Sequence, residues 1–151
     1  AAMCVGMAQG IIIVLGGTSA TDGTALNTIL HSISQAMQGF PPVISAWLMY
    51  IFQAVFNFFV VSGSGQAALT MPIMAPLADL VGVERQVACV AFQLGDAFTN
   101  VIVPTSGVLL GALAAAKLEW GQWAKFQIKF QALLFIMSSA TVILAVLVGL
   151  S

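Results

Sequence analysis

Two strongly apolar segments of this chain are joined by the polar sequence Ser62-Gly63-Ser64-Gly65-Gln66. Neither flanking segment, residues 43–61 before it and residues 67–78 after it, carries a charged side chain. Glycines that end one helix just before another begins leave backbone carbonyl and N–H groups without helical partners. In the hydrocarbon core of a membrane, such a break is tolerated only where it is buried in protein or lines a wet cavity. The stretch therefore indicates a structured site if the chain lies in a membrane.

The composition places the chain in a membrane. It has 151 residues, of which 60% are hydrophobic and 6% are charged, with a mean hydropathy of +1.06, whereas soluble domains are about 25% charged. No charged side chain occurs between Asp22 and Asp79, or from residue 130 to the last residue. The net charge of −1 provides no basic face for nucleic acid. We predict an all-α integral membrane protein whose partner is the lipid bilayer, with no nucleic acid, cofactor or metal centre.

The first 38 residues predict two elements. Residues 1–18 are typical of the end of a membrane helix that starts before this sequence. In residues 22–38, the apolar positions Leu26, Ile29, Leu30, Ile33 and Met37 recur at intervals of three and four, with polar residues opposite. Such a two-faced helix is too short to span a bilayer. We expect it to lie in the membrane interface.

Residues 42–80 allow two interpretations. They form either two full spans joined by a polar turn or one re-entrant hairpin whose tip stops inside the membrane. A turn exposed to water normally contains charged residues, whereas this one consists of five small or amide residues. The composition of the turn therefore favours the hairpin.

Residues 86–116 predict a second interruption. They contain one charge, Asp96, and would form a continuous helix about 46 Å long, which exceeds the ~30 Å hydrocarbon core. Small and polar residues cluster between Gly95 and Gly107, and Pro104 cannot donate the i to i−4 hydrogen bond. We therefore predict a broken helix.

The last 35 residues set the expected orientation. Residues 117–129 contain three lysines and two tryptophans, and an excess of lysine in a short loop marks the cytoplasmic side. Residues 130–150 are the expected final span of a multi-pass protein of the plasma (inner) membrane. Since the broken helix crosses once, the hairpin mouth and the C-terminus are predicted to lie outside.

Three motifs carry a family resemblance: Ser-Gly-Ser-Gly-Gln-Ala-Ala-Leu-Thr-Met-Pro-Ile-Met-Ala-Pro-Leu-Ala-Asp at 62–79, Phe-Gln-Leu-Gly-Asp-Ala-Phe-Thr-Asn at 92–100 and Pro-Thr-Ser-Gly at 104–107. Together they resemble the YfcC-like branch of the anaerobic dicarboxylate carrier (DcuC-like) family, within the ion transporter superfamily. The resemblance implies a carrier of two inverted repeats, each with one hairpin and one broken helix at a shared site. This chain, residues 1–151, is then a single membrane domain, the C-terminal repeat of a larger carrier. Its implied partners are a missing N-terminal repeat and further copies in a homo-oligomer.

The candidate site joins the hairpin tip to the helix break. A helix N-terminus favours an anion, and freed carbonyls suit a hard cation. Asp96 is the one acid expected deep in the membrane, which makes it a functional candidate. The alternative is that the glycines at the tip serve packing and Asp96 fixes the break. The candidates are Ser62, Gly63, Ser64, Gly65, Gln66, Asp96, Thr99, Asn100, Thr105, Ser106 and Gly107, with Asn57 and Pro104 as additions. A coupling sodium ion near Ser64, Thr99 and Asn100, or a proton, fits this set.

The predicted function is secondary active transport of a small organic anion or amino acid across the plasma membrane. The resemblance implies a dicarboxylate or an arginine- or ornithine-like substrate, coupled to an ion or to exchange. An ion channel or a pore-forming membrane subunit is the alternative, because hydroxyl- and carbonyl-lined breaks also conduct ions. An enzyme is disfavoured. Val60 and Val61 precede Ser62-Gly63, so the first glycine of a Gly-x-Ser-Gly protease pattern is absent, and Gln93 replaces the first glycine of the Gly-x-Gly-Asp pattern.

Overall fold

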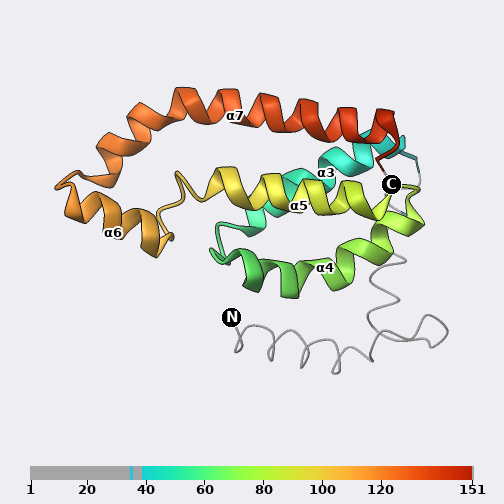
Figure 1. Ribbon diagram of the computed structural model, residues 1–151, viewed down its shortest axis with the longest axis horizontal. Coiled ribbons are helices and arrows are strands. Elements are labelled where there is room, and N and C mark those ends of the chain that lie inside the picture. Colours follow the sequence, from blue (N-terminus) through green and yellow to red (C-terminus); the bar gives the residue numbers. More distant parts are fainter. Residues whose placement is uncertain (1–34, 36–38, 151) are drawn as a thin grey trace.

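The computed structural model describes residue 35 and residues 39–150, and this part of the chain is helical without strands. Its helices are α3 (Pro42–Phe56), α4 (Gly63–Leu80), α5 (Arg85–Thr99), α6 (Gly107–Ala115) and α7 (Trp120–Val148) (Figure 1). The predicted all-helical fold is thus confirmed for the described residues. The helix end expected at 1–18 and the interface helix expected at 22–38 lie outside them, apart from Gln35.

The polar stretch does separate two helices, but the interruption comes earlier than its glycines. Helix α3 begins with Pro42 at its first position, where a missing N–H costs nothing, and it ends at Phe56. The chain leaves the helix at residues 57–62. The Ser62 side chain then caps α4 by accepting a hydrogen bond from Gly65 N at 3.3 Å. Residues 63–66 consequently form the first turn of α4.

The segment expected to be a broken helix is two helices. Helix α5 ends at Thr99 and α6 begins at Gly107, so the break occupies residues 100–106 and contains Pro104. Ser106 caps α6, its hydroxyl accepting a hydrogen bond from Leu109 N at 3.4 Å. Each interruption therefore ends in a serine that starts the next helix.

Helix α7 starts ten residues before the expected final span. Residues 116–119 alone join it to α6, and Leu118 N donates to Leu113 O at 2.9 Å to close the turn. Within the described part of the chain, α7 is the one helix long and apolar enough to cross a membrane. Its 29 residues correspond to about 44 Å. The lysines at 125 and 129 extend the helix because lysine is a good helix former.

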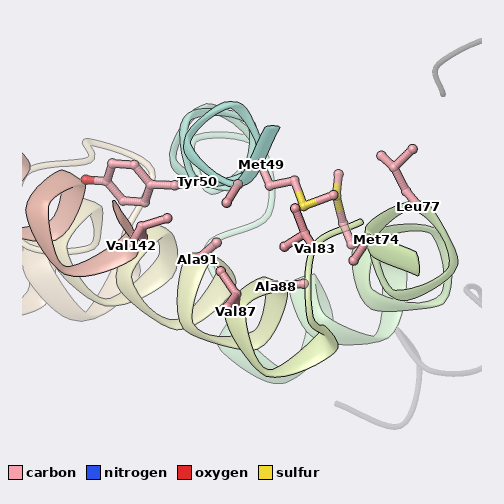
Figure 2. Packing of buried hydrophobic residues seen from close by; sticks show 11 residues of the cluster. Met49, Tyr50, Met74, Leu77, Val83, Val87, Ala88, Ala91 and Val142 are labelled. Carbon is pink, nitrogen blue, oxygen red and sulfur yellow. The ribbon is translucent and has the colours of Figure 1, made fainter. Parts of the chain in front are cut away.

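Helices α3 and α5 form the centre of the bundle, because they contact each other and each also contacts α4 and α7. In Figure 1, α7, α5 and α4 run side by side with α3 behind them, and the beginning of α5 lies near the ends of α4 and α7. Figure 2 shows Met49 of α3 beside Met74 and Val83, and Tyr50 beside Val142 of α7. At the exposed end of the bundle, Arg85 Nε donates to both carboxylate oxygens of Asp79 at 3.0 Å. This ion pair ties α4 to the start of α5.

A glycine allows α3 and α5 to touch backbone to backbone. A Cβ atom added at Gly95 would lie 2.7 Å from Gln53 Cβ and 3.0 Å from Ala54 N. These nearby atoms belong to the α3 backbone or are bonded to it, so they could make room for the Cβ only if α3 itself moved. Small residues at helix contacts in membranes permit this close approach. Gly95 therefore sets the distance between the two helices that carry the tip and the break.

We expect Gly95→Ala to lower the stability of the protein by about 1–3 kcal/mol, the usual cost of overpacking a tight contact. Gly111→Ala is the matched control, because a Cβ at Gly111 has nothing within 4 Å. The measurement is the melting temperature of the full-length protein in detergent. Equal melting temperatures for the two variants would contradict the close contact at Gly95.

Candidate functional site

The turn after α3 lies against the break after α5. Thr105 Oγ1 donates a hydrogen bond to Phe58 O at 3.0 Å, which joins the two interruptions directly. Helices α3 and α5 both run toward this region from the end that carries the Asp79–Arg85 pair, so their C-terminal ends meet (Figure 1). The structure thus brings together the two polar regions that are about 40 residues apart in the sequence.

Asn57 is the central polar contact between the turn and α5. Its side-chain nitrogen Nδ2 lies 2.6 Å from Thr99 Oγ1, 3.2 Å from Asn100 Oδ1 and 3.3 Å from Asp96 O. The residue is fully buried. Its oxygen Oδ1 is also buried and has no hydrogen-bond partner among the described residues. Asn57 therefore offers one unused acceptor beside the end of α5.

The carboxylate of Asp96 lies between Asn100 and the first residue of α4. Asn100 Nδ2 donates to Asp96 Oδ1 at 3.0 Å. A Cβ atom at Gly63 would lie 2.9 Å from Asp96 Oδ2, so the absence of a side chain at Gly63 makes room for the carboxylate. The N-terminal end of a helix carries a partial positive charge that favours a nearby anion. The start of α4 thus lies against the Asp96 side chain.

A cavity of about 460 Å³ opens above this cluster. That volume is typical of small-molecule sites. Its polar lining comes from Ser62, Asn100 and Ser106, so the capping serines of both α4 and α6 border the same space. The remaining lining residues are Val61, Gly63, Val101, Val108, Leu109 and Ala112. Because none of these described residues is charged, an anion here would be held by helix N-termini, hydroxyls and an amide.

The predicted site residues divide into three groups. The cavity is lined by Ser62, Gly63, Asn100 and Ser106. Asp96, Thr99 and Asn57 form the hydrogen-bonded cluster beneath it, and Thr105 bonds the turn. The other candidates do not line the cavity: Ser64, Pro104 and Gly107 are exposed, while Gly65 and Gln66 are buried in α4.

Gln66 belongs to a buried hydrogen-bond network that the sequence interpretation missed. Its Nε2 lies 2.8 Å from Gln53 Oε1 and 3.0 Å from Gln53 O, and Gln53 Nε2 donates to Thr70 Oγ1 at 3.1 Å. These three residues join α3 to α4. The available signal was the presence of Gln53 in an otherwise apolar helix, four residues before Asn57 and therefore on the same helical face.

The comparisons with known proteins agree with the geometry. The sequence profile described as "C4-dicarboxylate anaerobic carrier" (DcuC) matches residues 1–147. A protein of Escherichia coli strain K12 with the provisional name "basic amino acid antiporter YfcC" is 53% identical over 148 residues, which cover 98% of this chain and 29% of that protein. An uncharacterised protein of Haemophilus influenzae is 31% identical, over 95% of this chain and 27% of its own length. No solved structure matches this chain significantly.

The chain spans less than a third of the length of the relatives it matches. The family profile nevertheless covers almost all of its residues. The chain belongs to the C4-dicarboxylate anaerobic carrier family, a family of membrane transport proteins.

Proposed function

We propose that this chain forms one half of the substrate site of a secondary active transporter. The observation that carries the proposal is the cavity where the capped N-terminal ends of α4 and α6 meet beside Asn100. Broken helices whose N-termini point at a substrate are how secondary transporters bind anionic groups. The family membership supports the same function. Such a site binds and releases its substrate and changes no covalent bond.

The proposed substrate is an amino acid whose carboxylate binds at the two helix N-termini. The cavity wall contains no described lysine or arginine, so one carboxylate can be held here by N–H and hydroxyl donors. The relative named as a basic amino acid antiporter supports an arginine- or ornithine-like substrate that moves by exchange. A dicarboxylate, which the family description names, is the competing substrate. Competition between labelled arginine and unlabelled succinate distinguishes them.

The coupling ion, if exchange is not the sole mode, is assigned to the cluster beneath the cavity. Oxygen atoms of Asp96, Thr99, Asn100 and Asn57 lie together there, and Asn57 Oδ1 has no described partner. Oxygen ligands suit a hard cation such as sodium. A proton carried by the Asp96 side chain is the other coupling ion that we propose. The same cluster therefore supports either of the two predicted coupling ions.

The helix lengths support a re-entrant hairpin. Helices α3 and α5 have 15 residues each, or about 22 Å, which is shorter than a ~30 Å core. Gln131 of α7 donates to Phe98 O at 3.0 Å, so the break lies at the level of that residue. Helix α7 continues from Gln131 to Val148, which is about 26 Å beyond this level. We propose that the tip ends inside the membrane, with the hairpin mouth and the C-terminus outside the plasma membrane.

The other half of the site is proposed to come from a second repeat. The chain spans 29% of the Escherichia coli relative, which leaves room for another hairpin and broken helix in the whole protein. The cavity is open rather than enclosed on all sides, as expected if a partner repeat faces it. Assembly of the whole protein into homo-oligomers stays a prediction.

A channel is the alternative function for the same arrangement. Hydroxyls and amides at a helix break can also conduct ions. Uptake of labelled arginine into vesicles loaded with unlabelled arginine separates the two. Saturable, accelerated exchange supports a carrier, whereas unsaturable flux without acceleration would exclude the carrier.

Two serines at the hairpin tip provide a matched test of the site. We expect Ser62→Ala in the full-length protein to reduce arginine uptake at least about tenfold, because it removes a hydroxyl from the cavity and the cap of α4. Ser64→Ala should keep near wild-type uptake, since Ser64 is exposed and outside the cavity lining. Membrane insertion is checked by the amount of protein in the membrane fraction. Wild-type uptake for Ser62→Ala would contradict this cavity as the substrate site.

We expect Asn57→Asp to weaken the contact between the hairpin tip and the break, and so to lower the stability of the protein. The substitution replaces the Asn57 N–H donor by an acceptor that faces the same three oxygens, so we expect a loss of about 2–4 kcal/mol of stability. Gln122→Glu, the same chemical change at an exposed position of α7, is the control. The melting temperatures of both variants measure the effect. A melting temperature for Asn57→Asp equal to that of the control would disprove the role of Asn57 as the donor.

A further inference from the structure

The first three turns of α7 donate three side-chain hydrogen bonds to the helix break. Trp120 Nε1 donates to Ile102 O at 3.0 Å, and Trp123 Nε1 donates to Val101 O at 2.9 Å. Gln131 Nε2 donates to Phe98 O at 3.0 Å. All three acceptors are backbone carbonyls at the end of α5 or in the break. The tryptophans are therefore more than membrane-interface residues.

The donors lie on one face of α7. Positions 120, 123, 127 and 131 are separated by three or four residues, which places them along a single helical stripe. Gln127, between the donors, is buried, while Lys125 and Lys129 are exposed. The start of α7 thus presents an N–H-bearing face to the break and its lysines to the surroundings.

These bonds provide hydrogen-bond donors for backbone carbonyls at the break. The last carbonyls of a helix have no helical N–H partner, and in a membrane an unpartnered carbonyl costs several kcal/mol. Indole N–H is a donor without acceptor capacity, so it pairs with a carbonyl and cannot compete for backbone N–H groups. Val101 also lines the cavity. The bond from Trp123 therefore fixes part of the cavity wall.

The turn between α6 and α7 brings these donors to the break. Lys117 adopts a left-handed backbone conformation with φ of 56°, and Leu118 N bonds to Leu113 O at 2.9 Å. This tight closure reverses the chain within residues 116–119 and places Trp120 beside Ile102. A long mobile loop could not hold the two indole rings at defined carbonyls.

We propose that Trp120, Trp123 and Gln131 are positioning residues that hold the break in the shape required by the cavity. The segment of residues 120–131 is then a brace for the site, although residues 117–129 were expected from their lysines to be a cytoplasmic loop and Gln131 was expected in the final span. The brace makes the substrate affinity depend on residues that never touch the substrate. The proposal rests on the proposed function only in taking the cavity as the transport site.

The first measurement is amide hydrogen exchange of residues 100–106 in the full-length protein in lipid nanodiscs, without substrate. The amides of Ile102 and Val103 donate to Thr99 O at 3.1 Å, so their exchange reports whether the break keeps its shape. We expect the double variant Trp120→Phe, Trp123→Phe to exchange there at least about tenfold faster, as the loss of two hydrogen bonds allows. An isosteric benzothiophene analogue of tryptophan at position 123 removes the N–H alone and should act in the same direction.

Trp47→Phe is the matched control. The indole of Trp47 donates to Ser139 Oγ at 3.1 Å, a bond of similar length between α3 and α7 that does not involve the break. We expect Trp47→Phe to leave exchange at residues 100–106 unchanged. Unchanged exchange in the double variant would overturn the proposal, and so would equal acceleration in Trp47→Phe, since that would show general loosening.

The second measurement is the concentration dependence of arginine uptake. A positioning role predicts an increase of about fivefold in KM for each lost bond, with the maximal rate kept within about twofold. A fall in maximal rate without a change in KM would contradict positioning of the site. If Ser62→Ala transports normally while exchange in the brace variant still rises, the substrate-site assignment fails and the brace remains. The two proposals can therefore fail separately.

Discussion

The need to satisfy backbone polar groups at two helix interruptions governs this structure. Helices α3 and α5 both end at these interruptions, and in the hydrocarbon core of a membrane no water would solvate their free carbonyls. Side chains take the place of water: Asn57 and Thr99 bond the end of α5, and the indoles of α7 bond the break. The helices that follow start at capping serines for the same reason. Two of the residues that stabilise the interruptions, Ser62 and Ser106, also border the cavity.

The contact between Gly95 and Gln53 fixes the positions of the two interruptions relative to each other. Gly95 allows the α5 backbone to lie against Gln53 of α3, and the Gln53 side chain bonds Gln66 on α4. One residue therefore links three helices close to the tip. Buried amide bonds of this kind resist separation because each broken bond would leave a polar group in an apolar interior. The tip and the break are accordingly expected to move as one body in the proposed transport cycle.

The sequence predicted the interruptions well because their causes are local. Small residues and prolines mark both places, Asp96 precedes the second, and the motifs around them identified the family that the profile match shows. The sequence could not separate residues that border the cavity from their neighbours. Ser62 and Ser64 look equivalent in the sequence, yet the turn of α4 places one on the cavity and exposes the other. That difference depends on where the helix starts.

By itself, the sequence determined the membrane class, the helical content and the existence of the two breaks, because composition, helix periodicity and proline chemistry act over short stretches. Only the tertiary structure decided which polar groups meet. Gln66 turned out to bond Gln53, Asp96 to lie against Gly63, and Trp123 to bond Val101. These contacts join residues 13 to 33 positions apart. They depend on the packing of α3, α4, α5 and α7, which no local pattern encodes.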